Sequence, residues 1–377
     1  MTRSGRIAAA VACVFILACR PAVACAGWRD VFRDSTDGKF DASDYLLTRK
    51  GALVVPMIIT EPAIGYGGGA AFVFFQQSIA EIVAQSQGRR RYRPPNIYAA
   101  AGFGTENGTW GGAGGGMMSL ADDRWRLRGG GGYFNLNLDF YGSGGEGPKL
   151  GYTLLGVGGA SELVYRLGST NAWVGPRAQL FQLENRFDNA ALAPFVDETR
   201  VSIGFGPLLE YDSRDNIFTP NRGWTSSVQD LFYEPAFGSD ESFQSYRGYV
   251  FAYAPLPRHL VLGARLDARS TSGDAPFYMQ PYIDLRGIPT VRYQGDHTAV
   301  WEGELRWNVT PRWALMGFGG AGRAWESHAA FSEAASHPAG GTGFRYLLAR
   351  QLGFYSGLDF AWGPQFALYI QMGNAWR

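Results

Sequence analysis

The stretch from Ala299 to Val309 alternates strictly between two kinds of side chain. One face carries apolar or small residues and the other mostly polar or charged ones: Ala299, Trp301, Gly303, Leu305, Trp307 and Val309 against Val300, Glu302, Glu304, Arg306 and Asn308. A period of two is typical of a β-strand, whose successive side chains point to opposite faces. In a soluble sandwich the apolar face would cover a core, whereas in a transmembrane barrel it would face lipid and the polar face a wet lumen.

The composition favours the second alternative. Only 18% of the 377 residues are charged, 15% are aromatic, and 52 are glycines, many of them inside strand-like runs. A low charge fraction with many aromatic residues suits a surface that meets lipid and has aromatic anchors at both interfaces. The net charge of +1 argues against a nucleic-acid partner, because such binding relies on an excess of Lys and Arg.

The first 24 residues have the organisation of a secretory signal peptide. Arg3 and Arg6 precede an apolar stretch from Ile7 to Ala18, and Ala22-Val23-Ala24 offers a small-residue cleavage site. The apolar stretch is shorter than the roughly 20 residues that a membrane-spanning helix needs. The only cysteines lie in or beside this segment: Cys13, Cys19 and Cys25. Cleavage as a lipoprotein before Cys19 or Cys25 is an alternative, and in either case no internal disulfide is expected.

The remainder divides into a short polar part and a long strand-rich part. Residues 25–50 are polar and aperiodic, which predicts a solvated periplasmic linker. From residue 51 to residue 377, about sixteen apolar or alternating runs follow, an even number as in bacterial single-chain barrels. We therefore predict an all-β fold, a transmembrane antiparallel β-barrel of about 16 strands in the bacterial outer membrane.

One strand-like run and one connection within residues 51–377 lead to further predictions. In the run Arg124 to Tyr141 the apolar positions change from odd to even numbers, which predicts a bulge or bend at Gly129–Gly132. The connection Ser78 to Pro95 is long although it lies in the series of short turns. Its arginines could bind acidic lipid head groups or a partner, or could simply be solvated.

Three motifs stand out within the strand-rich part. The connection Tyr211 to Trp224 is rich in turn-forming residues, and its marked positions are Asp212, Arg214, Asp215, Asn216, Pro220 and Gly223. The longest loop contains Leu285-Arg286-Gly287-Ile288. The chain ends with PQFALYIQMGNAW, a closing strand whose apolar residues are Phe366, Leu368, Ile370, Met372 and Trp376. Taken singly, the first motif could be a plain turn and Arg286 a solvated loop arginine.

Together the three motifs resemble those of the bacterial surface-antigen family, the superfamily of BamA and TamA. The resemblance covers roughly residues 51 to 377 and implies a loop lock, in which Arg286 and Gly287 fold back into the barrel. Glu304 faces inward by parity and is the expected partner of Arg286. The family often supplies a second acid on the next strand, where this chain has Gly320, so we expect a thin counter-charge. The family's POTRA domains are not expected, because residues 27–50 are too few to hold one.

The resemblance also implies a function, namely insertion or translocation of proteins, or of lipids, at a weak seam between the first and last strands. Pro56 in the first strand would loosen that seam because it donates no backbone hydrogen bond. The alternative is a passive channel or structural surface barrel gated by the Arg286 loop. The expected partners are outer-membrane lipid and unfolded outer-membrane or secreted polypeptides, and we expect a monomer. No nucleophile–base pair, metal cluster or nucleotide loop is visible, so we expect no enzyme activity, no cofactor and no metal.

Overall fold

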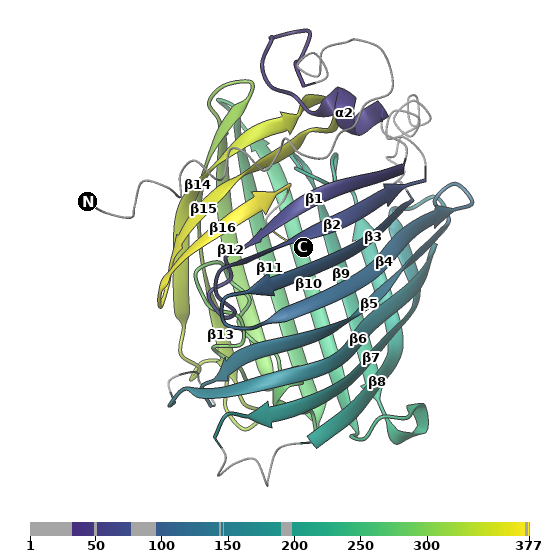
Figure 1. The fold of residues 1–377 in the computed structure, drawn as a ribbon, viewed down its shortest axis with the longest axis vertical. Helices are drawn as coiled ribbons and strands as arrows, with labels where there is room; N and C mark the ends of the chain where they lie inside the picture. Colours follow the sequence, from purple (N-terminus) through teal and green to yellow (C-terminus); the bar gives the residue numbers. More distant parts are fainter. Residues whose placement is uncertain are drawn as a thin grey trace.

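The computed structural model describes residues 32–48, 51–76, 96–142, 145, 147–189, 198–373 and 376. Within them, sixteen antiparallel strands form one sheet in sequential order, and the sheet curls into a barrel (Figure 1). The strands are β1 Gly51–Ile59, β2 Gly67–Phe75, β3 Ile97–Thr105, β4 Trp110–Leu120, β5 Trp125–Phe140, β6 Leu150–Arg166, β7 Ala172–Phe187, β8 Glu198–Asp212, β9 Gly223–Tyr233, β10 Phe243–Leu256, β11 Leu260–Gly273, β12 His297–Asn308, β13 Trp313–Trp325, β14 His337–Ala349, β15 Phe354–Trp362 and β16 Phe366–Met372. The predicted all-β barrel of sixteen strands is confirmed. The candidate signal peptide, the cysteines and the Ser78–Pro95 connection lie outside the described residues.

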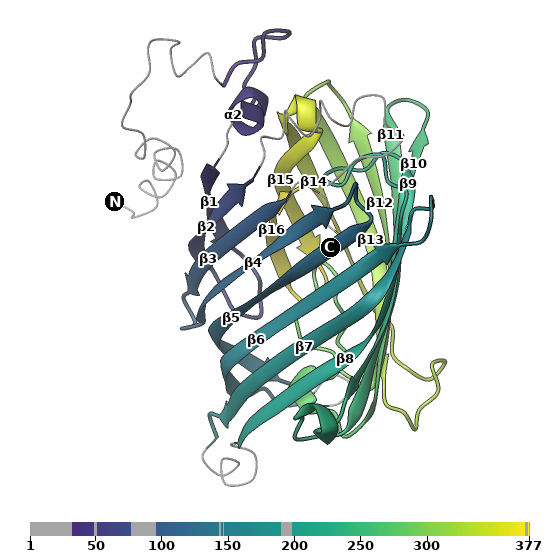
Figure 2. The same cartoon turned by 90° about the vertical axis from the view of Figure 1, so that its right-hand side faces the viewer.

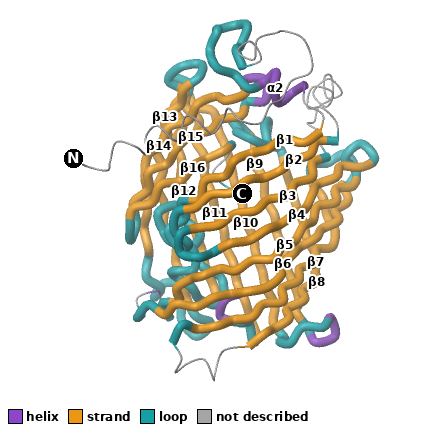
Figure 3. The backbone as a smooth tube through the Cα atoms, in the orientation of Figure 1, coloured by secondary structure: helices purple, strands orange, loops and turns teal. Residues whose placement is uncertain are grey.

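Among the residues that the structure describes, four short helical segments accompany the sheet, and they lie near the ends of the barrel (Figure 3). They are α2 Ser43–Thr48 and the 3-10 turns η3 Pro235–Phe237, η4 Phe277–Met279 and η5 Arg350–Leu352. None of the described helices is long and apolar enough to cross a membrane.

The alternation seen in the sequence separates an apolar outer face from a charged interior. Leu266 and Trp301 are 62% and 57% exposed, whereas their sequence neighbours Asp267 and Glu302 are 3% and 2% exposed. A soluble sandwich would show the reverse, because its apolar residues would be the buried ones. The arrangement is that of a barrel whose outer surface meets lipid and whose inner surface is polar.

The bulge predicted at Gly129–Gly132 is absent. There β5 pairs with β4 and with β6 in unbroken register, and Trp125 and Tyr133 both remain exposed on the outer face. Phe134 lies on the inner face by alternation, and its ring packs close to Gly158. The apolar residues that suggested a change of phase therefore line the lumen.

The strand order begins at β1 and ends at β16, and no backbone pairing joins these two among the described residues. The two strands nevertheless lie beside each other, at the front of the barrel in Figure 1. Both are short, with 9 residues in β1 and 7 in β16. We call this unpaired junction the seam.

Residues 32–48 pack against one end of the barrel, beside the turn that joins β14 to β15 (Figure 2). The sequence predicts a solvated linker here, but Asp34, Asp41 and Ser43 are buried. This part of the prediction is corrected, and the reason is a set of arginines on the barrel turns, described below.

Neighbouring glycines of β4 offer a test of how tightly the wall is packed. A Cβ added to Gly115 would lie 2.6 Å from the Gly129 carbonyl oxygen, whereas one added to Gly114 would meet nothing nearer than 3.5 Å. We expect Gly115→Ala to destabilise the barrel by about 1–3 kcal/mol through overpacking. The matched control Gly114→Ala should change stability by less than about 0.5 kcal/mol. Urea unfolding of the lipid-embedded protein, followed by tryptophan fluorescence, measures both, and equal midpoints would contradict this packing.

Candidate functional site

The loop between β11 and β12, residues 274–296, folds back into the barrel. Ile283, Leu285 and Ile288 are almost fully buried and form an apolar cluster with Tyr293 and Val300. These side chains fix the loop by removing apolar surface from water. The loop is therefore held by packing as well as by the charges that follow.

Gly287 occupies a position that only glycine fills without strain. Its φ is +93°, in the left-handed region, and an added Cβ would lie 3.1 Å from the backbone carbon of Trp362. Other residues would be disfavoured by the dihedral and by the close approach to β15. The glycine thus allows the neighbouring arginine to reach the inner wall.

Arg286 donates a hydrogen bond to each of three buried carboxylates. Its Nε lies 2.7 Å from Glu302, its Nη2 2.9 Å from Glu304, and its Nη1 2.8 Å from Asp359. The guanidinium also stacks over Phe318, with 3.7 Å between the Cζ atom and the ring centroid. Charge-assisted hydrogen bonds together with a cation–π contact hold it in one geometry.

The structure brings together the three sequence-predicted loop-lock residues Arg286, Gly287 and Glu304, but it adds partners that the sequence analysis did not assign. Glu302 lies two residues before Glu304 on the same strand and therefore also faces inward. This alternation is the sequence signal that identifies Glu302 as a possible partner of Arg286. Asp359 comes from β15 and is also held by Arg345, at 2.6 and 2.9 Å. The expectation of a thin counter-charge at Gly320 is wrong, because Asp359 supplies the missing acid from another strand.

The charge network extends beyond Arg286 to the residue two positions before it. Asp284 accepts hydrogen bonds from Arg265 at 3.1 Å and from Arg269 at 2.8 Å. Both arginines also pair with Asp267 on β11. Opposite charges thus neighbour one another on this part of the inner wall, and the arginines and aspartates of this network are paired, as buried charges require.

The loop reaches both sides of the seam. The Gly287 backbone N–H donates to the Tyr369 hydroxyl on β16 at 3.1 Å, and the Thr290 N–H donates to Glu61, in the turn after β1, at 3.2 Å. Arg286 itself bonds to β15. One segment therefore links the first and last hairpins, which share no backbone ladder.

The marked residues of the β8–β9 connection make a compact, braced turn. Arg214 donates to both oxygens of Asp212, and Asp215 accepts from the backbone N–H groups of Asn221 and Arg222. Gly223 has a φ of +94° and approaches the Ser213 carbonyl oxygen, so a Cβ would clash there. The residue types of the motif are therefore explained by the turn they form.

The same turn reaches across the barrel end to distant strands. Asn216 donates to the Leu352 carbonyl oxygen at 2.8 Å, and Arg306 of β12 donates to the Pro220 carbonyl oxygen at 3.1 Å. Because β8 and β9 lie far from β12 and β15 in the strand order, the turn braces the barrel across its mouth.

The closing strand is shorter than the sequence predicts, and Trp376 is not part of it. Phe366, Leu368, Ile370 and Met372 lie in β16, which ends at Met372. Trp376 is instead buried in the lumen, where it packs against Phe251 and Tyr253 of β10. Its indole N–H donates to Glu302 at 2.6 Å, so the end of the chain and Arg286 share one carboxylate.

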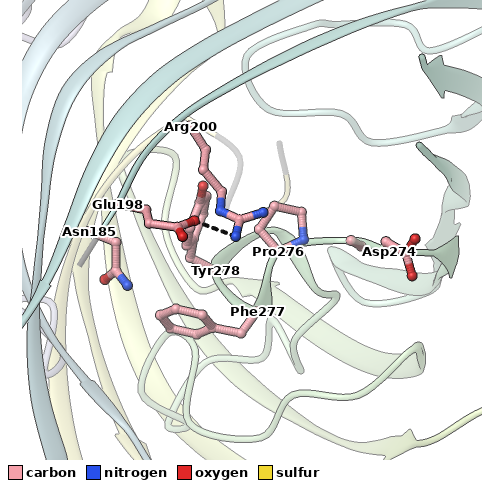
Figure 4. Close-up of a pocket in the computed structure, with 8 residues that line it drawn as sticks. Asn185, Glu198, Arg200, Asp274, Pro276, Phe277 and Tyr278 are labelled. Carbon is pink, nitrogen blue, oxygen red and sulfur yellow. Dashed lines mark ion pairs between the residues drawn. The ribbon is translucent and has the colours of Figure 1, made fainter. Parts of the chain in front are cut away.

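A pocket opens at the end of the barrel that carries the long loops (Figure 4). It is lined by Asn185, Glu198, Arg200, Asp274, Ala275, Pro276, Phe277 and Tyr278. Arg200 pairs with Glu198 and with Glu241, so its charge is already compensated. Phe277 packs against aromatic rings of the wall, including Tyr152 with 5.1 Å between centroids. The pocket therefore lies where the loop of residues 274–296 leaves β11, and the side chains of Arg200 and Phe277 already have partners. Among the described residues, no group of three His, Cys, Asp or Glu side chains is placed to hold a metal ion.

Solved structures share this architecture. BamA from Haemophilus ducreyi lacking POTRA domains 1–3 matches with a TM-score of 0.56 and 11% identity, over 86% of this chain and 69% of that one. CdiB from Escherichia coli (TM-score 0.56, 11% identity, 84% of this chain and 60% of that one) and CdiB from Acinetobacter baumannii (0.53, 11%, 86% and 57%) also match. This chain thus spans less than two thirds of either CdiB chain. No protein-family model matches the chain, and a search of curated proteins finds no match.

The comparisons define the class of the fold. The chain forms a sixteen-stranded barrel of the kind seen in BamA and CdiB, which agrees with the resemblance of the three sequence motifs. At 11% identity the likeness concerns the fold alone.

Removing the guanidinium tests whether these contacts hold the loop. In Arg286→Ala the carboxylates of Glu302, Glu304 and Asp359 lose their shared partner, and breaking such a buried pair typically costs about 3–5 kcal/mol. We expect amide hydrogen exchange in residues 283–293 to accelerate at least tenfold. Arg323→Ala is the matched control, since Arg323 is a partly exposed arginine of β13 that bonds to the Phe331 carbonyl oxygen. Unchanged protection of the loop in Arg286→Ala would show that apolar packing alone fixes it.

Proposed function

We propose that this protein is an outer-membrane barrel that assists insertion or translocation of polypeptides through the seam between β1 and β16. The observation that carries the proposal is that these neighbouring strands share no backbone pairing among the described residues. The apolar outer face and the charged interior support a position in a bilayer.

An unpaired strand edge in lipid is unfavourable, because no water is present to bond its N–H and C=O groups. Such an edge pairs readily with an incoming extended segment, which supplies the missing partners. The 7 residues of β16 offer a short template of this kind. On the other side, Pro56 of β1 has no backbone donor, so a complete ladder between the two strands is also disfavoured.

The loop provides a means of holding the seam without a ladder. Its two bonds to the first and last hairpins, from Thr290 to Glu61 and from Gly287 to Tyr369, are single hydrogen bonds. A typical hydrogen bond contributes only about 0.5–1.5 kcal/mol net. Opening the seam would therefore cost less than breaking a ladder along a whole strand, and the Arg286 contacts would set how firmly the loop remains docked.

Cross-linking the seam tests the proposed role. We expect a disulfide between one cysteine in Val54–Ile59 and one in Leu368–Met372 to abolish acceleration of the folding of a second barrel protein into liposomes. Reduction should restore the acceleration. A disulfide between residues 252 and 264, which face each other in the β10–β11 ladder, is the control and should have no effect. The proposal fails if the seam disulfide forms fully and the acceleration is unchanged.

A passive channel gated by the loop is the second candidate, because residues 283–288 fill part of the lumen. In that case Arg286→Ala should enlarge a stable single-channel conductance in planar bilayers, because the loop would leave the lumen. The unmodified protein should then give no acceleration of folding in liposomes. The combination of a small, unchanged conductance with accelerated folding would exclude the channel as the main role.

A further inference from the structure

Arg312, in the turn between β12 and β13, has no exposed surface although it lies at the end of the barrel. Three aspartates from the N-terminal segment surround it. It donates to Asp37 at 2.7 and 3.0 Å, to Asp34 at 2.5 Å, and also to Asp41. The three carboxylates come from a segment more than 270 residues away in the sequence. Charge-assisted hydrogen bonds therefore attach this segment to the barrel turn at a specific position.

A second arginine reinforces the contact. Arg350, in the turn between β14 and β15, donates from Nε to Asp34 at 2.5 Å, and its backbone N–H donates to Asp41 at 3.1 Å. Backbone groups also join the two parts, since the Ala42 N–H donates to the Leu348 carbonyl oxygen at 2.7 Å. The segment is therefore docked by ion pairs and by main-chain bonds together.

The helix that follows, α2, takes part in an apolar cluster at the end of the seam. Leu46 of α2 belongs to a cluster with Ala349, Leu352, Phe75 and Phe354. Phe75 is the last residue of β2, the neighbour of β1, whereas Phe354 is the first residue of β15, the neighbour of β16. Leu46, Phe75 and Phe354 all pack against the buried pair Ala349 and Leu352, so the helix shares one apolar cluster with hairpins on both sides of the unpaired junction.

We propose that residues 32–48 form an N-terminal clasp, a releasable strap that holds one end of the seam closed. Because β1 begins three residues after α2, the docked clasp sets where β1 starts relative to β15. The loop at residues 274–296 holds the seam from inside the lumen, and the clasp holds it at the barrel end. This inference goes beyond the role in polypeptide insertion and does not depend on it.

The charges of the clasp are stable near neutral pH. Hydrogen bonds from Arg350 lower the pKa of Asp34, and those from Arg312 lower the pKa of Asp37. A carboxyl group with a lowered folded-state pKa contributes stability above its unfolded-state pKa, near 3.9, and loses it as the pH falls through the lower folded value. Mild acid should therefore leave the clasp docked, and its release requires loss of the arginine contacts.

Neutralising the clasp tests the proposal. In the triple variant Asp34→Asn, Asp37→Asn and Asp41→Asn, the size of each side chain is kept while the ion pairs are lost. We expect amide hydrogen exchange of the full-length barrel in nanodiscs to accelerate at least tenfold in residues 32–48 and also in β1. The β10–β11 hairpin should be unchanged. Arg222→Ala, which removes an exposed arginine at the same end, is the control and should alter neither region.

A second variant separates the apolar bridge from the ion pairs. Leu46→Ser should accelerate exchange in β1 while residues 34–41 stay protected, and it decides the question if the triple variant does not fold. The proposal is overturned if residues 32–48 exchange freely in the triple variant while β1 keeps its protection. A uniform acceleration across all strands would also overturn it, because the clasp would then support the whole barrel and not the seam.

Discussion

A backbone inside a bilayer must satisfy its own hydrogen bonds, and this constraint governs the architecture of the chain. Fifteen strand junctions meet it with antiparallel ladders, whereas β1 and β16 share no ladder among the described residues. The structure compensates with side chains and loops. Residues 274–296 join the first and last hairpins from inside the lumen, and at one end Leu46 shares an apolar cluster with Phe75 and Phe354 of these hairpins.

Residues 274–296 and residues 32–48 are both fixed by arginine–carboxylate clusters. Such clusters constrain geometry differently from apolar packing. Apolar packing alone tolerates small shifts, whereas bidentate and shared ion pairs demand one geometry. Arg286 with Glu302, Glu304 and Asp359, and Arg312 with its aspartates, therefore fix the geometry in which each segment is docked.

Alternation along the sequence correctly predicted which face of the sheet a side chain occupies. It did not predict which distant residues lie at the same height along the barrel axis and so contact each other. Parity identified the inner and outer faces and put Glu304 on the inner one, and the resemblance of the motifs made it the expected partner of Arg286, but neither gives the height of a residue along the barrel axis. Asp359 is 73 residues from Arg286, and Asp34 is 278 residues from Arg312, so only strand tilt and register bring them together. The false bulge at Gly129–Gly132 has a related cause, because an apolar residue such as Phe134 can face a lumen that is locally lined by aromatic rings.

The alternating stretch of β12 explains why so many distant segments converge. Its inward residues bind the loop and the chain end through Glu302, the loop again through Glu304, and the β8–β9 turn through Arg306. The turn that follows it holds the N-terminal segment through Arg312. A strand inside the sheet, paired on both edges with β11 and β13, is a rigid support for these contacts. Several contacts of residues 274–296 and of residues 32–48 are therefore made with a part of the wall that does not itself border the seam.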